Sequence, residues 1–300
     1  MTEEITYAGL YDKGKAELLL AGIENADFDA RALLLYTFNL NLNDFYLEGR
    51  IKIPRDKDDK IKSYKNYIKK RASHIPLQYI TGFQNFCGME FLVNEAVLIP
   101  RQDTEVLVEA VLKKEAGCKN SENKKRLLDV CTGSGAIAIA LKKLGEFERI
   151  CALDISKEAL KVAKKNAELN NAEISFIESD MFKNLKLPYK FDVIVSNPPY
   201  IKSADIATLM PEVAKHEPLQ ALDGDWDGLY FYRILAKEAG NYLAAGGRVY
   251  LEIGSWQAAE VKLIFQERGF ENIEVEKDLA GLDRVMYMTK SQAAVKISCI

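Results

Sequence analysis

Hydrophobic positions in the first 75 residues recur with the period of a helix. One set lies in the segment "NADFDARALLLYTFNL" and the other follows Pro54. The positions are Phe28, Leu34, Leu35 and Phe38 in the first set, and Ile61, Tyr64, Ile68 and Ala72 in the second. Spacings of three and four residues place each set on one face of a helix. The pattern therefore predicts a small helical bundle over residues 1–75.

The composition of the chain changes after residue 75. The segment "LQYITGFQNFCGMEFLVNEAVLI" is rich in aromatic and β-branched residues and has a glycine near its middle. Such residues favour strands, and a central glycine favours a turn between them. We expect residues 76–100 to form a β-hairpin that links two domains.

From residue 101 onward, continuous apolar runs alternate with helical segments. Continuous runs are typical of strands that are covered on both faces of a sheet. The predicted strands are 126–131, 149–154, 173–178, 191–196, 247–253, 273–277 and 284–289. The last two lie close together in the chain and should pair antiparallel, which makes the sheet mixed. Residues 101–290 are thus predicted to form a doubly wound α/β domain, and the tail 291–300 carries no interpretable signal.

Composition narrows the class of protein. Of the 300 residues, 48% are hydrophobic and 28% are charged, and no apolar run approaches the roughly 20 residues of a membrane helix. The first residues lack the features of a secretory signal, and the five cysteines are scattered, so we expect a cytoplasmic protein that does not bind membranes. With two histidines, a histidine-rich zinc site is not expected, and no metal is predicted.

Charge bears on the kind of partner. The net charge of −3 argues against a protein that mainly grips a phosphate backbone. Residues 52–71 are a local exception, because lysine and arginine outnumber aspartate there. This basic segment is interpreted either as a solvated helix face or as a docking surface for an acidic partner or RNA.

The segment "LLDVCTGSGAIAIAL" predicts a buried strand, a glycine turn and a helix. Gly133 and Gly135 allow the backbone to turn sharply and to approach a ligand, and the helix start offers free N–H groups. An adenosine-linked ligand with a carboxylate or phosphate suits this geometry. Asp154, at the end of the next strand, is positioned to bind ribose hydroxyls. Both NAD and S-adenosylmethionine remain possible at this point.

The end of the third strand offers a subsite for the base. In "SDMF", Asp180 can accept a hydrogen bond from an adenine amino group, and Met181 or Phe182 can cover the face of the ring. A plain loop acid beside a core aromatic residue is the alternative interpretation.

The fourth strand ends in "SNPPY". The two prolines stop the strand and provide carbonyl oxygens that only accept hydrogen bonds. Asn197 adds a side-chain acceptor, Tyr200 a flat ring, and Pro198 and Pro199 keep the backbone extended. Such a loop fits a planar group with an NH₂, either an amide or an aromatic amine. The sulfonium methyl of S-adenosylmethionine is the electrophile that needs neither metal nor covalent intermediate.

Several motifs together resemble the HemK/PrmC family of protein-(glutamine-N5) methyltransferases. They are "DFDARALLLY", "PLQYITG", "LIPRQDTE", "LLDVCTGSGAIAIAL", "SNPPYI", "HEPLQALDGDWDGLYFYR", "LEIG" and "LAGLDRV", and they span nearly the whole chain. The resemblance implies a Rossmann-like class I methyltransferase domain and an N-terminal bundle that recognises class I peptide chain release factors. It implies methyl transfer to the glutamine of their Gly-Gly-Gln motif, which tunes translation termination.

The resemblance also assigns site residues. For the cofactor it implies Cys131, Thr132, Gly133, Ser134, Gly135, Asp154, Met181 and Phe182. To these we add Asp180, from its place after the third strand, and Asn197 of the loop after the fourth. Substrate binding falls to Asn197, Pro198, Pro199 and Tyr200, with Asn197, Pro198 and Tyr200 in catalysis.

Two positions depart from the family pattern. Cys131 replaces a usual glycine, which we expect to be tolerated if its φ is negative and its thiol points away from the ligand. Met181 replaces a usual aromatic residue, so a thioether contact or Phe182 should serve adenine. Arg101 and Glu217 receive no role.

Two rival classes of function remain. One is a nucleic-acid amino-methyltransferase that uses the same loop on adenine N6 or guanine N2. The other is an NAD-dependent oxidoreductase, or a non-catalytic binding module, on the same fold.

Overall fold

The computed structural model describes residues 5–116, 125–183 and 185–291, which form two compact units. The helical unit comprises residues up to Gly82 together with Met210–His216. The sheet unit comprises the remainder, Phe83–Leu209 and the residues from Glu217 onward. The predicted tail 291–300 lies outside the described residues apart from Ser291. Within the described ranges, no helix has the length and apolar character to cross a bilayer.

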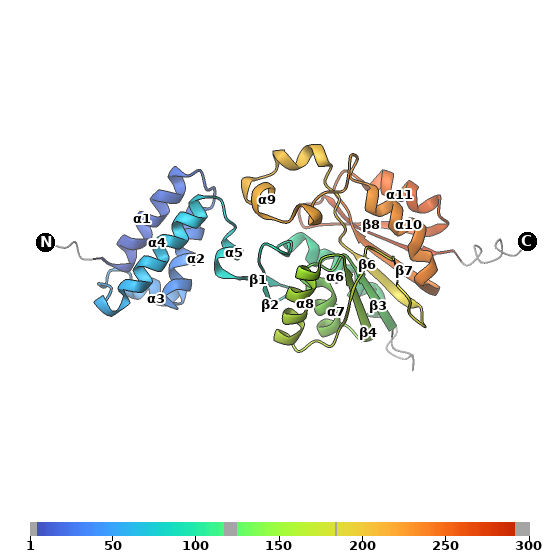
Figure 1. Ribbon diagram of the computed structural model, residues 1–300, viewed down its shortest axis with the longest axis horizontal. Helices are drawn as coiled ribbons and strands as arrows, with labels where there is room; N and C mark the ends of the chain where they lie inside the picture. Colours follow the sequence, from blue (N-terminus) through green and yellow to red (C-terminus); the bar gives the residue numbers. More distant parts are fainter. Residues whose placement is uncertain (1–4, 117–124, 184, 292–300) are drawn as a thin grey trace, which may run out of the picture. The chain divides into compact units, whose positions relative to one another are not determined.

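A seven-stranded mixed sheet forms the centre of the sheet unit (Figure 1). Its strand order is β5-β4-β3-β6-β7-β9-β8, with β9 antiparallel to both neighbours. The strands are β3 (Lys125–Val130), β4 (Phe147–Asp154), β5 (Ser175–Glu178), β6 (Phe191–Ser196), β7 (Leu243–Glu252), β8 (Phe270–Lys277) and β9 (Asp283–Lys290). Each predicted strand is present, and the prediction of a doubly wound α/β fold with an antiparallel last pair is confirmed.

Helices cover both faces of this sheet because its strands bury apolar side chains on both sides. One core contains α6 (Gln102–Glu115), α7 (Ala136–Leu144) and the end of α8 (Lys157–Leu169). The other contains α10 (Tyr230–Tyr242) and α11 (Ala258–Gln266). Neighbouring residues on β3 divide between the two: Leu127 faces the first core and Leu128 the second. The sheet is thereby a middle layer whose strand ends are left for loops.

A short hairpin precedes the sheet. Its strands are β1 (Phe83–Phe86) and β2 (Met89–Leu92), which pair antiparallel. The hairpin predicted over 76–100 is therefore present but shorter, because residues 77–81 form the helix α5 (Leu77–Thr81). Gly82 ends that helix at a φ of 85°. Asn166 of α8 binds the hairpin to the glycine turn: its Nδ2 donates to the carbonyls of Leu92 (3.0 Å) and Ser134 (2.9 Å).

Among the described residues, the helical unit contains five α-helices from the start of the chain, the last of which is α5, and one from its middle. The first four are α1 (Tyr7–Leu20), α2 (Ala26–Phe38), α3 (Leu42–Glu48) and α4 (Asp58–Ala72), with the 3₁₀ turn η1 (Arg55–Lys57) before α4. The later element is α9 (Pro211–His216), between the 3₁₀ turns η3 (Ser203–Thr208) and η4 (Leu219–Ala221). The predicted bundle is thus joined by a helix from beyond residue 200.

A buried ion-pair cluster holds α9 within the helical unit. Arg71 donates to Asp29 through Nε at 2.6 Å and to Glu212 through Nη2 at 2.7 Å. Both Arg71 and Asp29 are buried. Burial raises the pKa of Asp29, and the Arg71 guanidinium opposes this rise. Removing Arg71 would leave the buried Asp29 carboxylate without its cation, which is strongly destabilising.

Candidate active site

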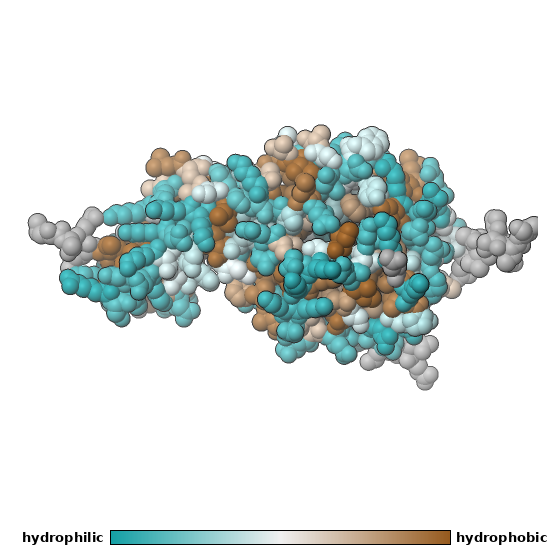
Figure 2. Space-filling model, in the orientation of Figure 1, coloured by the Kyte–Doolittle hydropathy of each residue, from teal (hydrophilic) through white to brown (hydrophobic). Residues whose placement is uncertain are grey.

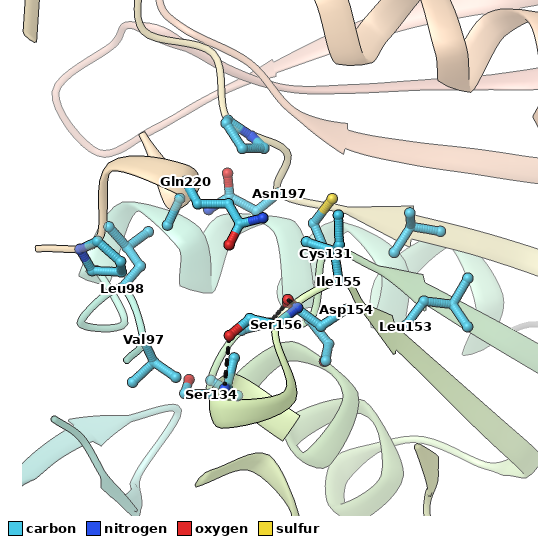
Figure 3. A pocket seen from close by; sticks show the side chains of 18 of the residues that line it. Val97, Leu98, Cys131, Ser134, Leu153, Asp154, Ile155, Ser156, Asn197 and Gln220 are labelled. Carbon is cyan, nitrogen blue, oxygen red and sulfur yellow. Dashed lines mark hydrogen bonds between the residues drawn. The ribbon is translucent and has the colours of Figure 1, made fainter. Parts of the chain in front are cut away.

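A cavity of about 490 Å³ lies at the carboxyl ends of the parallel strands of the sheet unit (Figure 3). Ligands of doubly wound sheets bind at this edge, and the volume suits a small organic molecule. In Figure 3, Asn197 and Gln220 lie on one side of the cavity and Asp154 and Ser156 on the other. Of the predicted site residues, the lining includes Cys131, Thr132, Gly133, Ser134, Asp154, Asp180, Met181, Asn197 and Pro199. It does not include Gly135, Phe182, Pro198 or Tyr200.

The glycine turn between β3 and α7 leaves room for a ligand at one position and packs a helix at the other. Gly133 has a φ of 54°, and an added Cβ would project into open space. Gly135 has a φ of 81°, and its Cβ would come 3.1 Å from Cβ of Ala163 on α8. Gly133 therefore serves the cavity, whereas Gly135 permits close packing of two helices.

Asp154 at the end of β4 supports this turn. Its Oδ2 accepts a hydrogen bond from the Gly133 N–H at 2.8 Å, and its Oδ1 accepts one from the Ser156 N–H at 2.9 Å. Burial raises the pKa of Asp154, and these backbone donors oppose the rise. Each carboxylate oxygen has a second lone pair, so Asp154 can hold the turn and still accept from a ligand hydroxyl.

A second carboxyl lies beneath the turn. Asp129 of β3 is fully buried; its Oδ2 accepts from the Thr132 hydroxyl at 2.6 Å. Its Oδ1 has no hydrogen-bond partner among the described residues. Burial raises the pKa of Asp129 to about 7. The folded state therefore holds a proton on this carboxyl more readily than the unfolded chain does.

The expectation of a negative φ for Cys131 is wrong. Its φ is 63°, in the left-handed region where a side chain costs about 1–2 kcal/mol. The tight turn after β3 demands that conformation whichever residue occupies it. Cys131 lines the cavity, and its Sγ lies 3.5 Å from Sδ of Met181, which also has a positive φ. Burial raises the pKa of the Cys131 thiol, which keeps it protonated.

Met181 and Phe182 have different surroundings. Met181 lines the cavity, whereas Phe182 is buried and stacks on Tyr242 with ring centroids 4.9 Å apart. Because Phe182 is buried and does not line the cavity, this arrangement favours Met181 for contact with a ligand there. Asp180, also on the cavity wall, forms an ion pair with the exposed Lys183 at 2.5 Å.

The loop Asn197–Tyr200 follows β6 and keeps acceptors available. Among the described residues, no hydrogen bond ends on the carbonyl of Asn197, Pro198 or Pro199. The Tyr200 carbonyl is different, since it accepts from Nε2 of Gln257 at 3.1 Å. The Asn197 Nδ2 lies 3.3 Å from Oγ1 of Thr104, and its Oδ1 accepts no hydrogen bond from a described residue. The loop thus offers three backbone carbonyls and one amide oxygen.

The segment "EPLQALDGDWDG" packs against this loop, a function that sequence reasoning did not assign to it. The Ile201 N–H donates to the Leu222 carbonyl at 3.0 Å, and the Gly224 N–H donates back to the Ile201 carbonyl at 2.7 Å. A Cβ on Gly228 would lie 2.4 Å from the Tyr200 carbonyl oxygen. The glycine spacing in the motif was the available signal, because close backbone approach requires glycine.

Arg101 and Glu217 form an ion pair between the two segments that flank the cavity. Arg101 lines the cavity and is bound through Nη2 to Oε1 of Glu217. The Glu217 side chain is only 1% exposed, and its Oε2 has no partner among the described residues. Burial raises the pKa of Glu217, and Arg101 opposes that rise. Gln220, which lies in the motif "HEPLQALDGDWDGLYFYR", also lines the cavity, although the sequence predicted no role for it.

Comparisons with known proteins agree with this geometry. Residues 102–218 match the family model described as "Methyltransferase small domain", and residues 10–82 match "PrmC N-terminal domain". A methyltransferase from Pyrococcus furiosus, known from its crystal structure, shares the fold with a TM-score of 0.50 at 18% identity, over 68% of this chain and 90% of that one.

Two curated relatives carry the comparison further. The release factor glutamine methyltransferase of Thermodesulfovibrio yellowstonii is 40% identical over 266 residues, which are 88% of this chain and 93% of the relative. That of Geobacter sulfurreducens is 37% identical over 281 residues, 94% of this chain and 95% of the relative. Fold and site thus define a methyltransferase with a doubly wound α/β domain. The chain belongs to the family of release factor glutamine methyltransferases.

Proposed function

We propose that this protein transfers a methyl group from S-adenosylmethionine to the side-chain amide nitrogen of a glutamine. The glutamine is the one in the Gly-Gly-Gln motif of class I release factors. One observation carries the proposal: among the described residues, the acceptors of Asn197 to Pro199 accept no hydrogen bond, and this loop borders a cavity of about 490 Å³. The relatives, which are named for glutamine methylation of release factors, support the choice of substrate.

The residues present fit S-adenosylmethionine. The open space at Gly133 would admit the methionyl part, Asp154 would hold the ribose, and Met181 would contact the adenine. When bound, this molecule supplies a methyl group whose leaving group is a neutral thioether. Asp180, as an acceptor on the cavity wall, would take a hydrogen bond from the adenine amino group.

The chain's own contribution is orientation of the glutamine amide. Two acceptors, Oδ1 of Asn197 and a carbonyl of the proline pair, would each take one hydrogen of the NH₂ group. Holding both hydrogens fixes the plane of the amide, so that one face of the nitrogen is directed toward the cavity. The same acceptors would stabilise the positive charge that develops on nitrogen as the N–C bond forms. One N–H bond then breaks, its electron pair stays on nitrogen, and the proton passes to water.

We infer that the helical unit contacts the release factor through α4. The exposed lysines of α4 form a basic face: Lys60, Lys62, Lys65, Lys69 and Lys70. In Figure 2, hydrophilic residues cover much of the helical unit where α4 lies in Figure 1. Arg71, which counted toward the basic segment, is buried and does not belong to that face. A partner with an acidic surface suits this face, and a protein that acts on release factors would work in the cytoplasm.

Mass spectrometry of the release factor's glutamine peptide, with and without this protein and S-adenosylmethionine, tests the proposed function. A mass increase of one methyl group on the glutamine is expected. Tritiated S-adenosylmethionine offered with release factor, rRNA and DNA in parallel tests the substrate class. Label on nucleic acid alone would contradict the proposal and favour a nucleic-acid amino-methyltransferase. Binding of NADH without binding of S-adenosylmethionine would favour an NAD-dependent oxidoreductase instead.

A further inference from the structure

Both tryptophans of the chain are largely exposed, and both lie near the loop Asn197–Tyr200, here called the acceptor loop. The Trp226 side chain is 73% exposed and that of Trp256 is 58% exposed. Tryptophan is highly buried on average in folded proteins, and it is enriched where one protein binds another. The two exposed rings are therefore candidates for a binding surface.

The side chain of Gln257 ties the segments of both tryptophans to the acceptor loop. Its Nε2 donates to the carbonyl of Tyr200 and to the carbonyl of Gly228, each at 3.1 Å. Trp256 directly precedes Gln257 in the chain, and Trp226 lies two residues before Gly228. Both tryptophans are thus attached close to the end of the acceptor loop.

The turn between β8 and β9 presents two leucines at the same edge of the sheet. Glu252, the last residue of β7, pairs with Val285 near the start of the antiparallel β9. Because β7 runs parallel to β6, this turn lies at the edge where β6 ends and the acceptor loop begins. Within the turn, Leu279 is fully exposed and Leu282 is about half exposed.

Hydrogen bonds fix the backbone of this turn. The buried Asp278 accepts at Oδ1 from the N–H groups of Ala280 and Leu282, both at 2.9 Å. Arg284 donates to Oδ2 of Asp278 through Nε at 3.2 Å and through Nη2 at 3.0 Å. The Ile253 N–H donates to the Arg284 carbonyl at 2.9 Å, which joins the turn to the segment after β7. A backbone that is already fixed loses little conformational entropy when it binds a partner.

We propose that four exposed side chains form an apolar rim, which docks apolar residues of the release factor around its Gly-Gly-Gln motif. The rim consists of Trp226, Trp256, Leu279 and Leu282. The proposal rests on the proposed methylation of that glutamine and names a further contact of the same substrate. A glutamine that reaches the acceptor loop belongs to a protein chain, so the residues around it must lie against this edge of the sheet unit.

Fluorine NMR tests the contact directly, because the chain contains two tryptophans and both belong to the rim. The protein is labelled with fluorotryptophan and titrated with unlabelled release factor. S-adenosylhomocysteine is present, since it has no methyl group to transfer and the complex therefore does not turn over. We expect both fluorine signals to shift as the release factor is added. Signals that stay in place at a saturating concentration would overturn the proposal.

Leu279→Ser/Leu282→Ser removes part of the rim, and neither leucine lines the cavity. We expect the Kd for the release factor to rise roughly tenfold, as for the loss of an anchor in an interface. The rise should persist at high salt, because salt screens charges and not apolar contacts. The Kd for S-adenosylmethionine and the rate on a short Gly-Gly-Gln peptide should stay within about twofold of wild type.

Leu144→Ser/Leu169→Ser is the matched control. These leucines are about half exposed and end α7 and α8, which run from the edge of the site back to the opposite edge of the sheet. Their replacement should leave the Kd for the release factor unchanged. An equal rise with both pairs, or no rise with the rim pair, contradicts the proposal.

Two further outcomes separate the proposal from its alternatives. If light scattering shows a dimeric wild type that the rim pair makes monomeric, at an unchanged Kd for the release factor, a second copy of the chain covers the rim and the proposal is wrong. If the release factor binds and shifts the fluorine signals but the wild type does not methylate it, the rim is supported and the proposed function is contradicted.

Discussion

At the scale of single residues, the site depends on buried carboxyl groups with more than one task. Asp154 holds the glycine turn through two backbone donors and remains able to accept from a ligand. Asp129 lies below the same turn, and one of its oxygens has no partner among the residues that the structure describes. Buried polar atoms without partners are costly in free energy, so their retention here is a sign of function or of pH-dependent stability.

Replacement of Asp154 should weaken cofactor binding directly. Asp154→Asn removes the charge and one backbone acceptor, at a cost of about 1.5–3 kcal/mol in binding free energy. That cost corresponds to a rise of roughly 10- to 150-fold in the Kd for S-adenosylmethionine. Calorimetric titration measures it. Glu158→Gln, which changes another carboxyl on the cavity wall, is the control, and equal affinities of both variants would place the ribose elsewhere.

Asp129 should make stability fall as pH rises. Its pKa is raised to about 7 in the folded protein and is 3.8 in a model compound. Between these values the folded state binds the proton and the unfolded state does not, so the free energy of unfolding decreases with pH. Asp129→Asn removes this dependence. Its Tm relative to wild type should therefore be higher at pH 8 than at pH 5, and a difference independent of pH would contradict the assignment.

At the scale of elements, the sequence predicted the strands well because their apolar runs are continuous. It predicted the helical face of α2 less well: Phe28 is 58% exposed, whereas Asp29 on the buried face pairs with Arg71. A polar pair in the core cannot be inferred from hydrophobic period. The site residues at strand ends followed from the sheet rule, but Thr104 and Gln220 did not, since tertiary contacts alone bring them to the cavity.

The turn that contains Gly228 should be as important for turnover as the loop it supports. Gly228→Ala would put Cβ 2.4 Å from the Tyr200 carbonyl oxygen, so the backbone of the loop must move. Gly269→Ala is the matched control, because Gly269 has a similar φ of 76° and open space around it. Both variants should lose about 1–2 kcal/mol of stability from the left-handed conformation.

Beyond this shared cost, the two glycine variants should differ in stability and in activity. We expect Gly228→Ala to lose more stability than Gly269→Ala and at least roughly tenfold in kcat, as for a displaced loop. Denaturant unfolding and initial rates measure the two quantities. Identical behaviour of the two variants would mean that the close approach of Gly228 to Tyr200 does not matter.

At the scale of the whole molecule, reversing surface charges on α4 should weaken recognition of the release factor without slowing methyl transfer itself. Lys65→Glu/Lys69→Glu reverses two exposed charges on α4, and we expect a several-fold loss in kcat/KM toward the intact release factor. The loss should shrink as salt is added, since exposed charges are screened within about 10 Å at 0.1 M. A short Gly-Gly-Gln peptide should be methylated at the wild-type rate.

A second charge reversal is the control for α4. Lys164→Glu/Lys165→Glu makes the same change on exposed residues of α8 in the sheet unit. If both double variants lose kcat/KM equally, or if the α4 variant loses as much on the short peptide, α4 does not recognise the release factor.

Because α9 belongs to the helical unit, this unit cannot be completed during synthesis until α9 has been translated. The first 82 residues leave the ribosome early, but their unit lacks Glu212 until residues 210–216 follow. At roughly 5–20 residues per second, the intervening stretch of about 130 residues delays that event by on the order of ten seconds. By then β3 to β6 have been made. Arg71 must wait for its second carboxylate, so the helical unit is finished only after much of the sheet has been translated.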